Sequence, residues 1–207
     1  MTMTIHRPDL QRTMSLKGWS SGGKKTLIRV TAPARDQGNA TLVIDDNKVW
    51  SFTPKINRVI RIPSSMMSQS WMGSDFSNKD VSRTDEIVDK YTHRLIQTNT
   101  IDGHKVHTIE SIPHEESAIV WGKEISHIRD DYVELEHEYY DQDMQLVKSL
   151  KTLDIKEMGG RMFAVQQRMS EIEKKQQWTE ISIEILDFDR EIPDYLFTLS
   201  NLRNPRK

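Results

Sequence analysis

Apolar and polar residues alternate with a period of two through most of this 207-residue chain. Residues 132–140 show the pattern clearly, because Val133, Leu135, His137 and Tyr139 share one parity and glutamates lie between them. Successive side chains of a β-strand point to opposite faces of a sheet, so the pattern predicts a half-buried strand with a charged outer face. A chain in which this period recurs throughout is expected to be mainly β.

Turn sequences separate the alternating segments at short intervals. Asp102–Gly103 and Gly159–Gly160 suit the positive φ angles of tight hairpins. We therefore expect an antiparallel meander in which hairpin follows hairpin, and a change of leucine parity predicts a β-bulge near Lys151–Thr152. The expected strands are 2–7, 11–20, 25–32, 39–45, 48–53, 57–62, 91–98, 105–112, 118–129, 132–140, 145–156, 162–171 and 178–188.

Length and composition agree with one soluble globular unit. Hydrophobic residues make up 36% of the chain and charged residues 29%, and no stretch approaches the roughly 18 apolar residues of a membrane span. All-β domains often exceed about 200 residues, so residues 1–207 are expected to form a single domain. The chain opens directly in strand-like sequence, and we expect Met1 to be an internal or artificial start.

One segment, residues 63–90, breaks the strand pattern. Ser64 or Ser65 can cap a short helix that Gly73 would end in a left-handed turn. Ser77 followed by Asp80 resembles a capping box, which predicts that a second short helix starts there. A last short helix is expected at Asp194–Asn201, after Pro193.

The same segment is rich in large apolar side chains. On a helix, Met67 and Trp71 would be neighbours four residues apart. Methionine is flexible and polarizable, so such a surface suits variable apolar partners and could form a lid over a cavity. The alternative is that these residues plug one end of the sheet core. The candidate lid residues are Met66, Met67, Trp71, Met72 and Phe76.

Catalytic and metal-binding patterns are weak. The chain has no cysteine, which excludes disulfides, thiolate catalysis and cysteine metal sites. His104 and His107 would lie on opposite faces of a strand, and we interpret His114, His127 and His137 as polar outer-face residues. Motifs for hydrolysis or phosphate binding are missing from the sequence. We therefore expect that the protein is not an enzyme and that it binds neither a metal nor a cofactor. A binding function is favoured over a catalytic one.

Charge is nearly balanced overall but unevenly placed. The formal net charge is −2, which argues against a nucleic-acid partner. Lys and Arg are in excess in residues 1–62, whereas Asp and Glu are in excess in residues 63–207. This asymmetry is typical either of a docking face or of two sets of solvated strand faces.

Residues 49–80, which read VWSFTPKINRVIRIPSSMMSQSWMGSDFSNKD, resemble the outer-membrane lipoprotein-sorting protein family, relatives of the LolA and LolB lipoprotein carriers. Supporting segments are LIRVTAP at 27–33, GNATL at 38–42 and IPDYLFT at 192–198. The resemblance implies a strongly curved antiparallel sheet, an incomplete β-barrel, with short helices forming a lid over its concave face. It also implies a periplasmic address, with a signal peptide and a first helix that this chain lacks.

The resemblance further implies an apolar cavity for acyl chains, with Trp50 and Phe52 at aromatic positions of a lining strand. The expected lining set is Leu42, Ile44, Trp50, Phe52, Ile60 and Ile62. Better-known carriers use a strand arginine that closes the lid, and Arg29, Arg58 and Arg61 are all candidates here. The implied role is lipid transport as a chaperone of outer-membrane biogenesis.

The first functional hypothesis is a periplasmic carrier of lipoprotein or other lipid acyl chains. Its partners would be those chains, an inner-membrane transporter and an outer-membrane acceptor, and not nucleic acid. The second hypothesis is an accessory protein of an envelope transporter, with a filled core and no cargo. In that case the uneven charge would supply its docking face.

Overall fold

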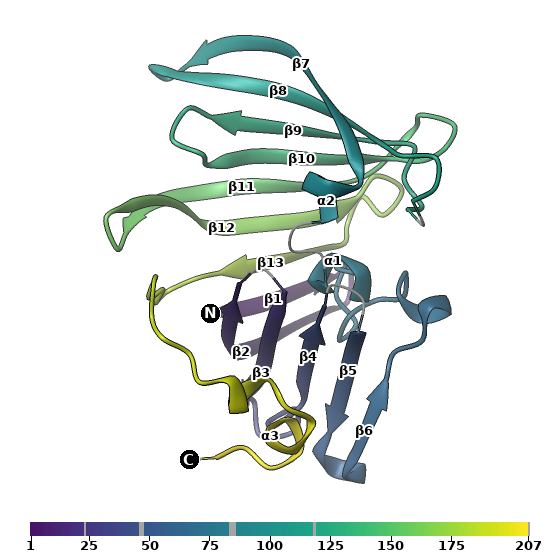
Figure 1. The fold of residues 1–207 in the computed structure, drawn as a ribbon, viewed down its shortest axis with the longest axis vertical. Coiled ribbons are helices and arrows are strands. Elements are labelled where there is room, and N and C mark those ends of the chain that lie inside the picture. Colours follow the sequence, from purple (N-terminus) through teal and green to yellow (C-terminus); the bar gives the residue numbers. More distant parts are fainter. Residues whose placement is uncertain (23, 46–47, 83–85, 118, 207) are drawn as a thin grey trace. The chain divides into compact units, whose positions relative to one another are not determined.

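The fold is seen in a computed structural model that describes residues 1–22, 24–45, 48–82, 86–117 and 119–206. The described residues form a mainly β protein with thirteen strands and short helices, as predicted (Figure 1). The strands are β1 (Thr2–Arg7), β2 (Leu10–Ser21), β3 (Lys25–Ala32), β4 (Ala40–Ile44), β5 (Lys48–Thr53), β6 (Arg58–Arg61), β7 (Tyr91–Ile101), β8 (His104–Pro113), β9 (Lys123–Arg129), β10 (Glu134–Tyr140), β11 (Leu146–Met158), β12 (Arg161–Glu171) and β13 (Trp178–Ser182).

Strand order in the antiparallel sheet is β6-β5-β4-β3-β2-β1-β13-β12-β11-β10-β9-β8-β7. The meander expected from the turn sequences is confirmed, because successive strands are neighbours from β2 to β6 and from β7 to β13. The predicted strand ranges differ mainly at their ends. The strand expected at 118–129 begins at Lys123, and the one expected at 178–188 ends at Ser182. The strong curvature of an incomplete barrel stays a prediction.

Two hairpins show why the turn sequences were informative. Asp102 and Gly103 have φ values of 50° and 82°, and Gly159 and Gly160 have φ values of 57° and 78°. Two consecutive residues with positive φ form the turn whose twist matches that of the strands it joins. The register between β11 and β12 shifts between Thr152 and Asp154, which confirms the predicted bulge.

Contacts divide the chain into two compact units, which we describe separately. Unit 1 comprises residues 1–5, 11–86 and 187–207, and unit 2 comprises residues 6–10 and 87–186. The expectation of one domain stays a prediction.

Both faces of the unit 1 sheet are apolar. In β4 and β5, Leu42 lies opposite Trp50 and Val43 lies opposite Val49. Leu42, Val43 and Val49 are each at most 1% exposed. Since neighbouring residues of a strand point to opposite faces, the buried side chains of Leu42 and Val43 lie on the two opposite faces of the sheet. We call the side of Leu42 and Trp50 face A, and the side of Val43 and Val49 face B.

The helices are η1 (Pro54–Ile56), η2 (Ser64–Met66), α1 (Asn78–Ser82), α2 (Glu86–Asp89), η3 (Asp194–Phe197) and α3 (Leu199–Arg203). Within the described ranges no helix is long and apolar enough to cross a membrane. The helix predicted after Pro193 is present as η3 and α3, and Thr198 caps α3 by accepting from the Asn201 amide at 3.2 Å.

The predicted lid insert, residues 63–90, is less helical than expected, and its residues 83–85 lie outside the described ranges. A helix running from Ser64 to Gly73 is wrong, because only η2 forms there. Residues 67–77 are turns and bends with an isolated β-bridge between Ser70 and Ser77. Serine side chains explain the difference. Ser70 Oγ donates to Ser74 O at 2.5 Å, and Ser74 Oγ donates to Trp71 O at 2.6 Å. Such local bonds compete with helical ones.

The capping box is confirmed. The Ser77 amide donates to Asp80 Oδ2 at 2.7 Å, and the Asp80 amide donates to Ser77 Oγ at 3.1 Å. The helix that follows is α1, one turn long. Gly73 has a φ of 78°, as expected for a left-handed turn.

Candidate lipid-binding site

Four of the six predicted lining residues meet on face A of unit 1. Leu42 and Phe52 are 0% and 6% exposed, and Ile44 and Trp50 are half-buried around them. The family resemblance and the strand parity had both grouped Trp50 with Phe52, and the structure places them in one cluster.

The described face A cluster includes neither Ile60 nor Ile62, and Ile62 follows the end of β6. In the β5–β6 pair, Phe52 is opposite Val59 and Ser51 is opposite Ile60. Val59 therefore packs on the face A cluster, whereas Ile60 belongs to face B and is 47% exposed. The register decides this, and a single sequence does not show in which register a four-residue strand pairs.

A C-terminal segment covers face A. Phe197 and Leu202 are 4% and 0% exposed and pack on Leu27, Leu42 and Phe52. Ile192 and Leu196 add half-buried contacts. We call residues 192–203 the C-terminal cover. Sequence reasoning predicted its helix but assigned it no role in the site.

Arg29 of β3 holds this cover. Its Nη2 donates to the carbonyls of Asn201 and Leu202, at 3.0 Å each, and its Nη1 donates to Gly38 O at 3.4 Å. Burial lowers the pKa of the Arg29 guanidinium from its ordinary value. The last carbonyls of a helix lack partners within the helix, so a half-buried cation at this end satisfies and neutralises them.

The other two candidate arginines do not contact a helix carbonyl in the described contacts. Arg58 is exposed, and the Arg61 guanidinium lies 5.9 Å from the centre of the Trp50 ring. Among the three alternatives left open by the sequence, Arg29 is the one that bonds a helix.

The predicted lid residues lie against face B. Trp71 and Phe76 are 4% and 9% exposed. Trp71 Nε1 donates to Thr41 Oγ1 at 2.9 Å, and Thr41 points to the face opposite Leu42. The structure therefore does not bring the predicted lid over Trp50 and Phe52. Of the remaining lid residues, Met67 and Met72 are half-buried and Met66 is 38% exposed.

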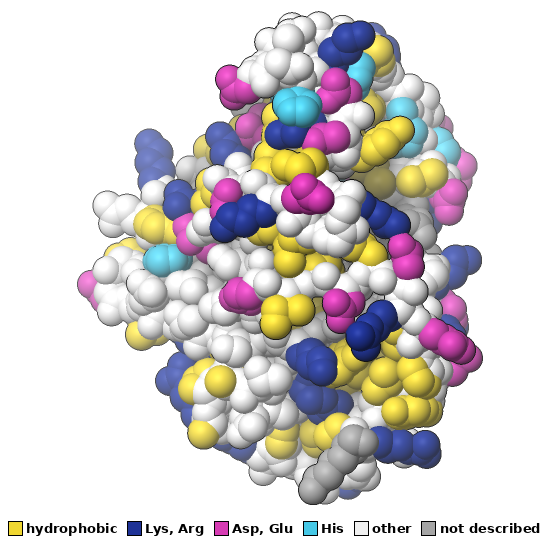
Figure 2. Space-filling view, turned by 90° about the vertical axis from the view of Figure 1, so that its left-hand side faces the viewer, with side chains coloured by type: hydrophobic (Ala, Val, Ile, Leu, Met, Phe, Trp, Pro, Cys, Tyr) yellow, Lys and Arg dark blue, Asp and Glu magenta, His cyan; other side chains and the backbone are white. Residues whose placement is uncertain are grey.

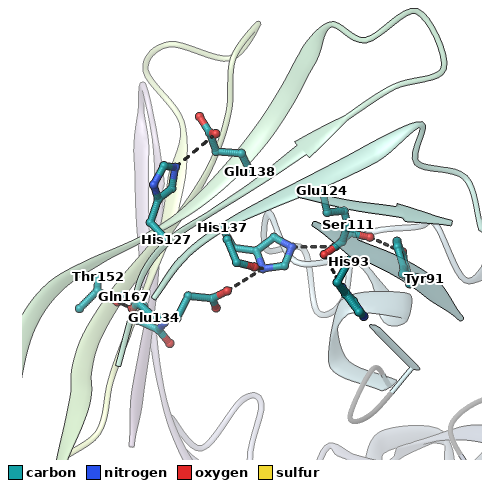
Figure 3. Close-up of polar contacts among 11 residues, drawn as sticks. Tyr91, His93, Ser111, Glu124, His127, Glu134, His137, Glu138, Thr152 and Gln167 are labelled. Atoms are coloured by element: carbon teal, nitrogen blue, oxygen red, sulfur yellow. Dashed lines mark hydrogen bonds and ion pairs between the residues drawn. The ribbon is translucent and has the colours of Figure 1, made fainter. Parts of the chain in front are cut away.

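Unit 2 contains a buried polar cluster that the sequence analysis missed (Figure 3). Glu124 of β9 is 0% exposed and accepts from Tyr91 Oη of β7. His137 of β10 lies between two carboxylates, with Nε2 2.7 Å from Glu124 Oε2 and Nδ1 2.8 Å from Glu134 Oε1. The interpretation of His137 as an outer-face residue is wrong. Its parity, shared with Val133 and Tyr139, was the available signal.

Electrostatics fix the charge of this cluster. Burial by itself would lower the pKa of His137, but the hydrogen bonds to Glu124 and Glu134 outweigh it and raise the pKa to about 9. An imidazolium whose two nitrogens both donate to carboxylates cannot accept a proton from a substrate. The cluster therefore ties β7, β9 and β10 together and is not arranged as a general base.

A second polar group in unit 2 has the composition of a metal site. His104, Asp130 and Asp131 place ligand atoms within 4.8 Å of one another. Arg129 lies among them, with Nη2 2.9 Å from His104 Nε2 and 2.6 Å from Asp131 Oδ2. A guanidinium that already neutralises the carboxylate makes this an ion-pair cluster and opposes a bound cation.

A hollow of about 500 Å³ lies along β11, β12 and β13 of unit 2. Val165, Met158 and Ile183 line part of it. The rest is polar and charged, and includes Asp154, Lys156, Glu157 and Glu184. Hydrocarbon chains gain no free energy against charged walls, so face A suits an acyl chain better than this hollow does.

Comparison with known proteins supports the fold over nearly its whole length. A family model described as "Uncharacterized protein" matches residues 22–204. The comparison with curated protein sequences gave no match. A DUF1329 family protein from Desulfovibrio piger is 28% identical, with a TM-score of 0.86 over 97% of this chain and 88% of that chain.

Two further crystal structures share the fold. An outer membrane lipoprotein-sorting protein domain from Vibrio parahaemolyticus is 24% identical, with a TM-score of 0.84 over 98% of this chain and 88% of its own. A LolA superfamily protein from Nitrosomonas europaea is 20% identical, with a TM-score of 0.72 over 95% and 88%. The chain therefore belongs to the family whose model matches residues 22–204, and it shares its fold with outer-membrane lipoprotein-sorting and LolA superfamily proteins.

Proposed function

We propose that this protein is a periplasmic carrier that binds the acyl chains of lipoproteins or other lipids on face A of unit 1. The observation that carries the proposal is the C-terminal cover. Leu27, Leu42 and Phe52 form an apolar sheet face that the C-terminal cover shields from water. Arg29 hydrogen-bonds the carbonyls at the end of that cover.

The cover is suited to exchange with a ligand. Its two helices are four and five residues long, and such short helices are not stable alone, so the cover depends on its contacts with the sheet. Local elements of this kind open at less than the global free energy of unfolding. When the cover moves away, an acyl chain can take the place of Phe197 and Leu202 on the sheet.

Burial energy makes such binding favourable. Transfer of each CH₂ from water is worth about 0.8 kcal/mol, so a chain of about 14 carbons contributes on the order of 10 kcal/mol before ordering costs. Unloading then requires a competing acceptor. We propose an inner-membrane transporter as the donor and an outer-membrane acceptor as the recipient. The strongly curved sheet that the family resemblance implies also belongs to this proposal.

The proposed role is binding without catalysis. Its support within the described residues is chemical: His137 is held as an imidazolium between two carboxylates, and Arg129 neutralises the His104 cluster. The lid segment around Trp71 covers face B and is the second element that we expect to respond to cargo.

Energy transfer from tryptophan to a fluorescent fatty acid tests the site. Trp50 borders face A, whereas Trp121 lies in unit 2 beside Tyr139. We expect saturable transfer that an unlabelled lysophospholipid displaces, and a larger loss of transfer in Trp50→Phe than in Trp121→Phe. The absence of saturable binding would overturn the carrier role. Transfer that depends on Trp121 instead would move the site away from face A.

A further inference from the structure

The edge strand of unit 1 carries an unusual run of sequence. Residues 48–74 contain no Asp or Glu, and Lys55, Arg58 and Arg61 fall within that run. Hydrophobic side chains lie between these cations in the sequence, and Ile56 and Ile60 are 59% and 47% exposed. We call residues 55–66 together with Arg203 the basic edge.

The fold brings Arg203 to this edge. Arg203 Nε, at the end of α3, donates to Asn57 Oδ1 at 2.8 Å. Asn57 sits in the left-handed turn between η1 and β6. Arg58 and Arg61 are exposed on opposite faces of β6, since Arg58 pairs with Thr53 and Arg61 with Trp50. Cations therefore surround the strand on both faces.

These cations form no ion pair with the described residues. In the described ranges, none of Lys55, Arg58, Arg61 and Arg203 has a carboxylate oxygen within 4.0 Å. The contrast with other cations of unit 1 is clear, because Lys48 pairs with Asp45 and Lys25 with Asp194, each at 2.7 Å. Figure 2 shows another part of the unit 1 surface, in the lower part of the picture, where Lys and Arg side chains also lie among hydrophobic ones.

We propose that the basic edge docks the protein on an anionic phospholipid bilayer. Lys and Arg near such a surface each contribute about 1 kcal/mol of attraction, and exposed apolar side chains between them can enter the headgroup boundary. Ile56, Ile60 and Met66, which is 38% exposed, supply that apolar part. An acidic protein partner would be attracted by the cations and would not require the exposed isoleucines. The interleaving of cations with exposed isoleucines favours the bilayer.

Vesicle flotation tests the docking surface. Vesicles of phosphatidylcholine with one quarter phosphatidylglycerol are compared with pure phosphatidylcholine at low and high salt. We expect binding only to the anionic vesicles, weakened by salt because the Debye length shortens. The triple variant Lys55→Gln, Arg58→Gln, Arg61→Gln should bind at least about tenfold more weakly.

A matched control removes the same number of charges from exposed positions of unit 2, as Lys105→Gln, Lys156→Gln, Lys175→Gln. It should bind like the unaltered protein. Ile56→Ser with Ile60→Ser keeps every charge and should also weaken binding, which an electrostatic contact with an acidic protein would not require. Thermal melting checks that each variant is folded.

Two results would overturn the proposal. One is equal binding by the triple variant and its control, and the other is no binding to anionic vesicles at low salt, which would leave the edge to an acidic protein surface. The inference is independent of acyl binding. If the protein floats with anionic vesicles but takes up no fatty acid, the carrier role is contradicted and membrane docking by the basic edge is supported.

Discussion

At the scale of single residues, Thr41 and Leu42 show how one strand serves two covers. Leu42 packs under the C-terminal cover on face A, and the neighbouring Thr41 accepts the indole hydrogen of Trp71 on face B. Thr41 is 3% exposed. A buried hydroxyl that loses its partner costs the desolvation free energy of the group, so this bond is a point where face B is sensitive to small changes.

Trp71→Phe removes the indole donor and leaves Thr41 without it. We expect the free energy of unfolding to fall by about 1–3 kcal/mol, the combined effect of the lost bond and the smaller ring. Thr41→Val removes the acceptor instead and keeps the volume. Urea unfolding of both single variants and the double variant gives the coupling energy. A favourable coupling is expected, and strictly additive effects would show that the bond contributes nothing.

His137 gives a prediction for pH. Its pKa in the folded protein is raised to about 9, above the ordinary value of 6.5. A group with a raised folded pKa contributes stability that is fully present below the unfolded pKa and is lost as pH rises through the folded pKa. The protein should therefore lose on the order of 2 kcal/mol of this contribution between about pH 6.5 and pH 9.

The reference for that measurement is the double variant Glu124→Gln, His137→Gln, which keeps hydrogen-bonding groups but removes the central charges. Urea unfolding at pH 6, 7.5 and 9 should show a decline in the unaltered protein that is smaller in the double variant. Parallel pH profiles for the two proteins would contradict the assignment of a charged His137.

Residue positions were only partly predictable from the sequence. Trp50, Phe52 and Leu42 could be grouped because parity along a strand is local information. Ile60 was expected to line the cavity, but Val59 is the β6 residue that packs on face A, because the pairing register of β6 depends on its neighbour. Arg29 could not be chosen from three arginines, since its partners at Asn201 and Leu202 are remote in sequence and only the fold brings them together.

At the scale of elements, the C-terminal cover and the lid segment are the two short segments that close unit 1. The cover is held by the Phe197 and Leu202 side chains and by Arg29. The lid segment is held by Trp71 and by Asn78, whose Nδ2 donates to the carbonyls of Met66 and Gln69 at 3.0 and 3.2 Å. We expect each of them to open without unfolding the sheet, since local elements open at less than the global free energy of unfolding.

Leu202→Ala tests the cover as an element. Leu202 is 0% exposed, and removal of a buried leucine side chain costs about 2–5 kcal/mol. If the cover opens locally, hydrogen exchange should accelerate at the amides of Leu202 and Asn204, which donate within α3, with little change in β12. Met169→Ala, at a 0% exposed site of β12, is the control and should accelerate exchange in β12.

Equal acceleration in both elements for Leu202→Ala would contradict a cover that moves on its own. Arg29→Lys is a second, milder variant, because lysine keeps the charge but lacks the planar fork that reaches two carbonyls. It should accelerate exchange in α3 by less than Leu202→Ala does.

Element types were well predicted wherever a strong period or turn sequence existed. All of the expected strands are present, because alternation and the Asp102–Gly103 type of turn are local signals. The helix expected from Ser64 to Gly73 failed because Ser70 and Ser74 bond to nearby backbone. Serine side chains can cap a helix, but their hydrogen bonds to nearby backbone can also take the place of helical hydrogen bonds. The sequence alone does not decide between these two outcomes.

At the scale of the whole molecule, three properties belong together in a carrier. Face A would offer apolar area to cargo, and the cover separates that area from water. The basic edge would supply the proposed contact with the membrane where cargo is exchanged. If the proposed carrier role holds, acyl burial of on the order of 10 kcal/mol would keep cargo bound in water until an acceptor competes for it.

The proposed carrier role is tested most directly by native mass spectrometry of the protein purified from its own cells, with lipid extraction of the same sample. The account predicts a bound population whose added mass matches an acyl lipid recovered in the extract, and a smaller bound fraction for Leu42→Asp if that variant remains folded. A lipid-free mass spectrum, with an extract that holds no acyl lipid, would contradict the account.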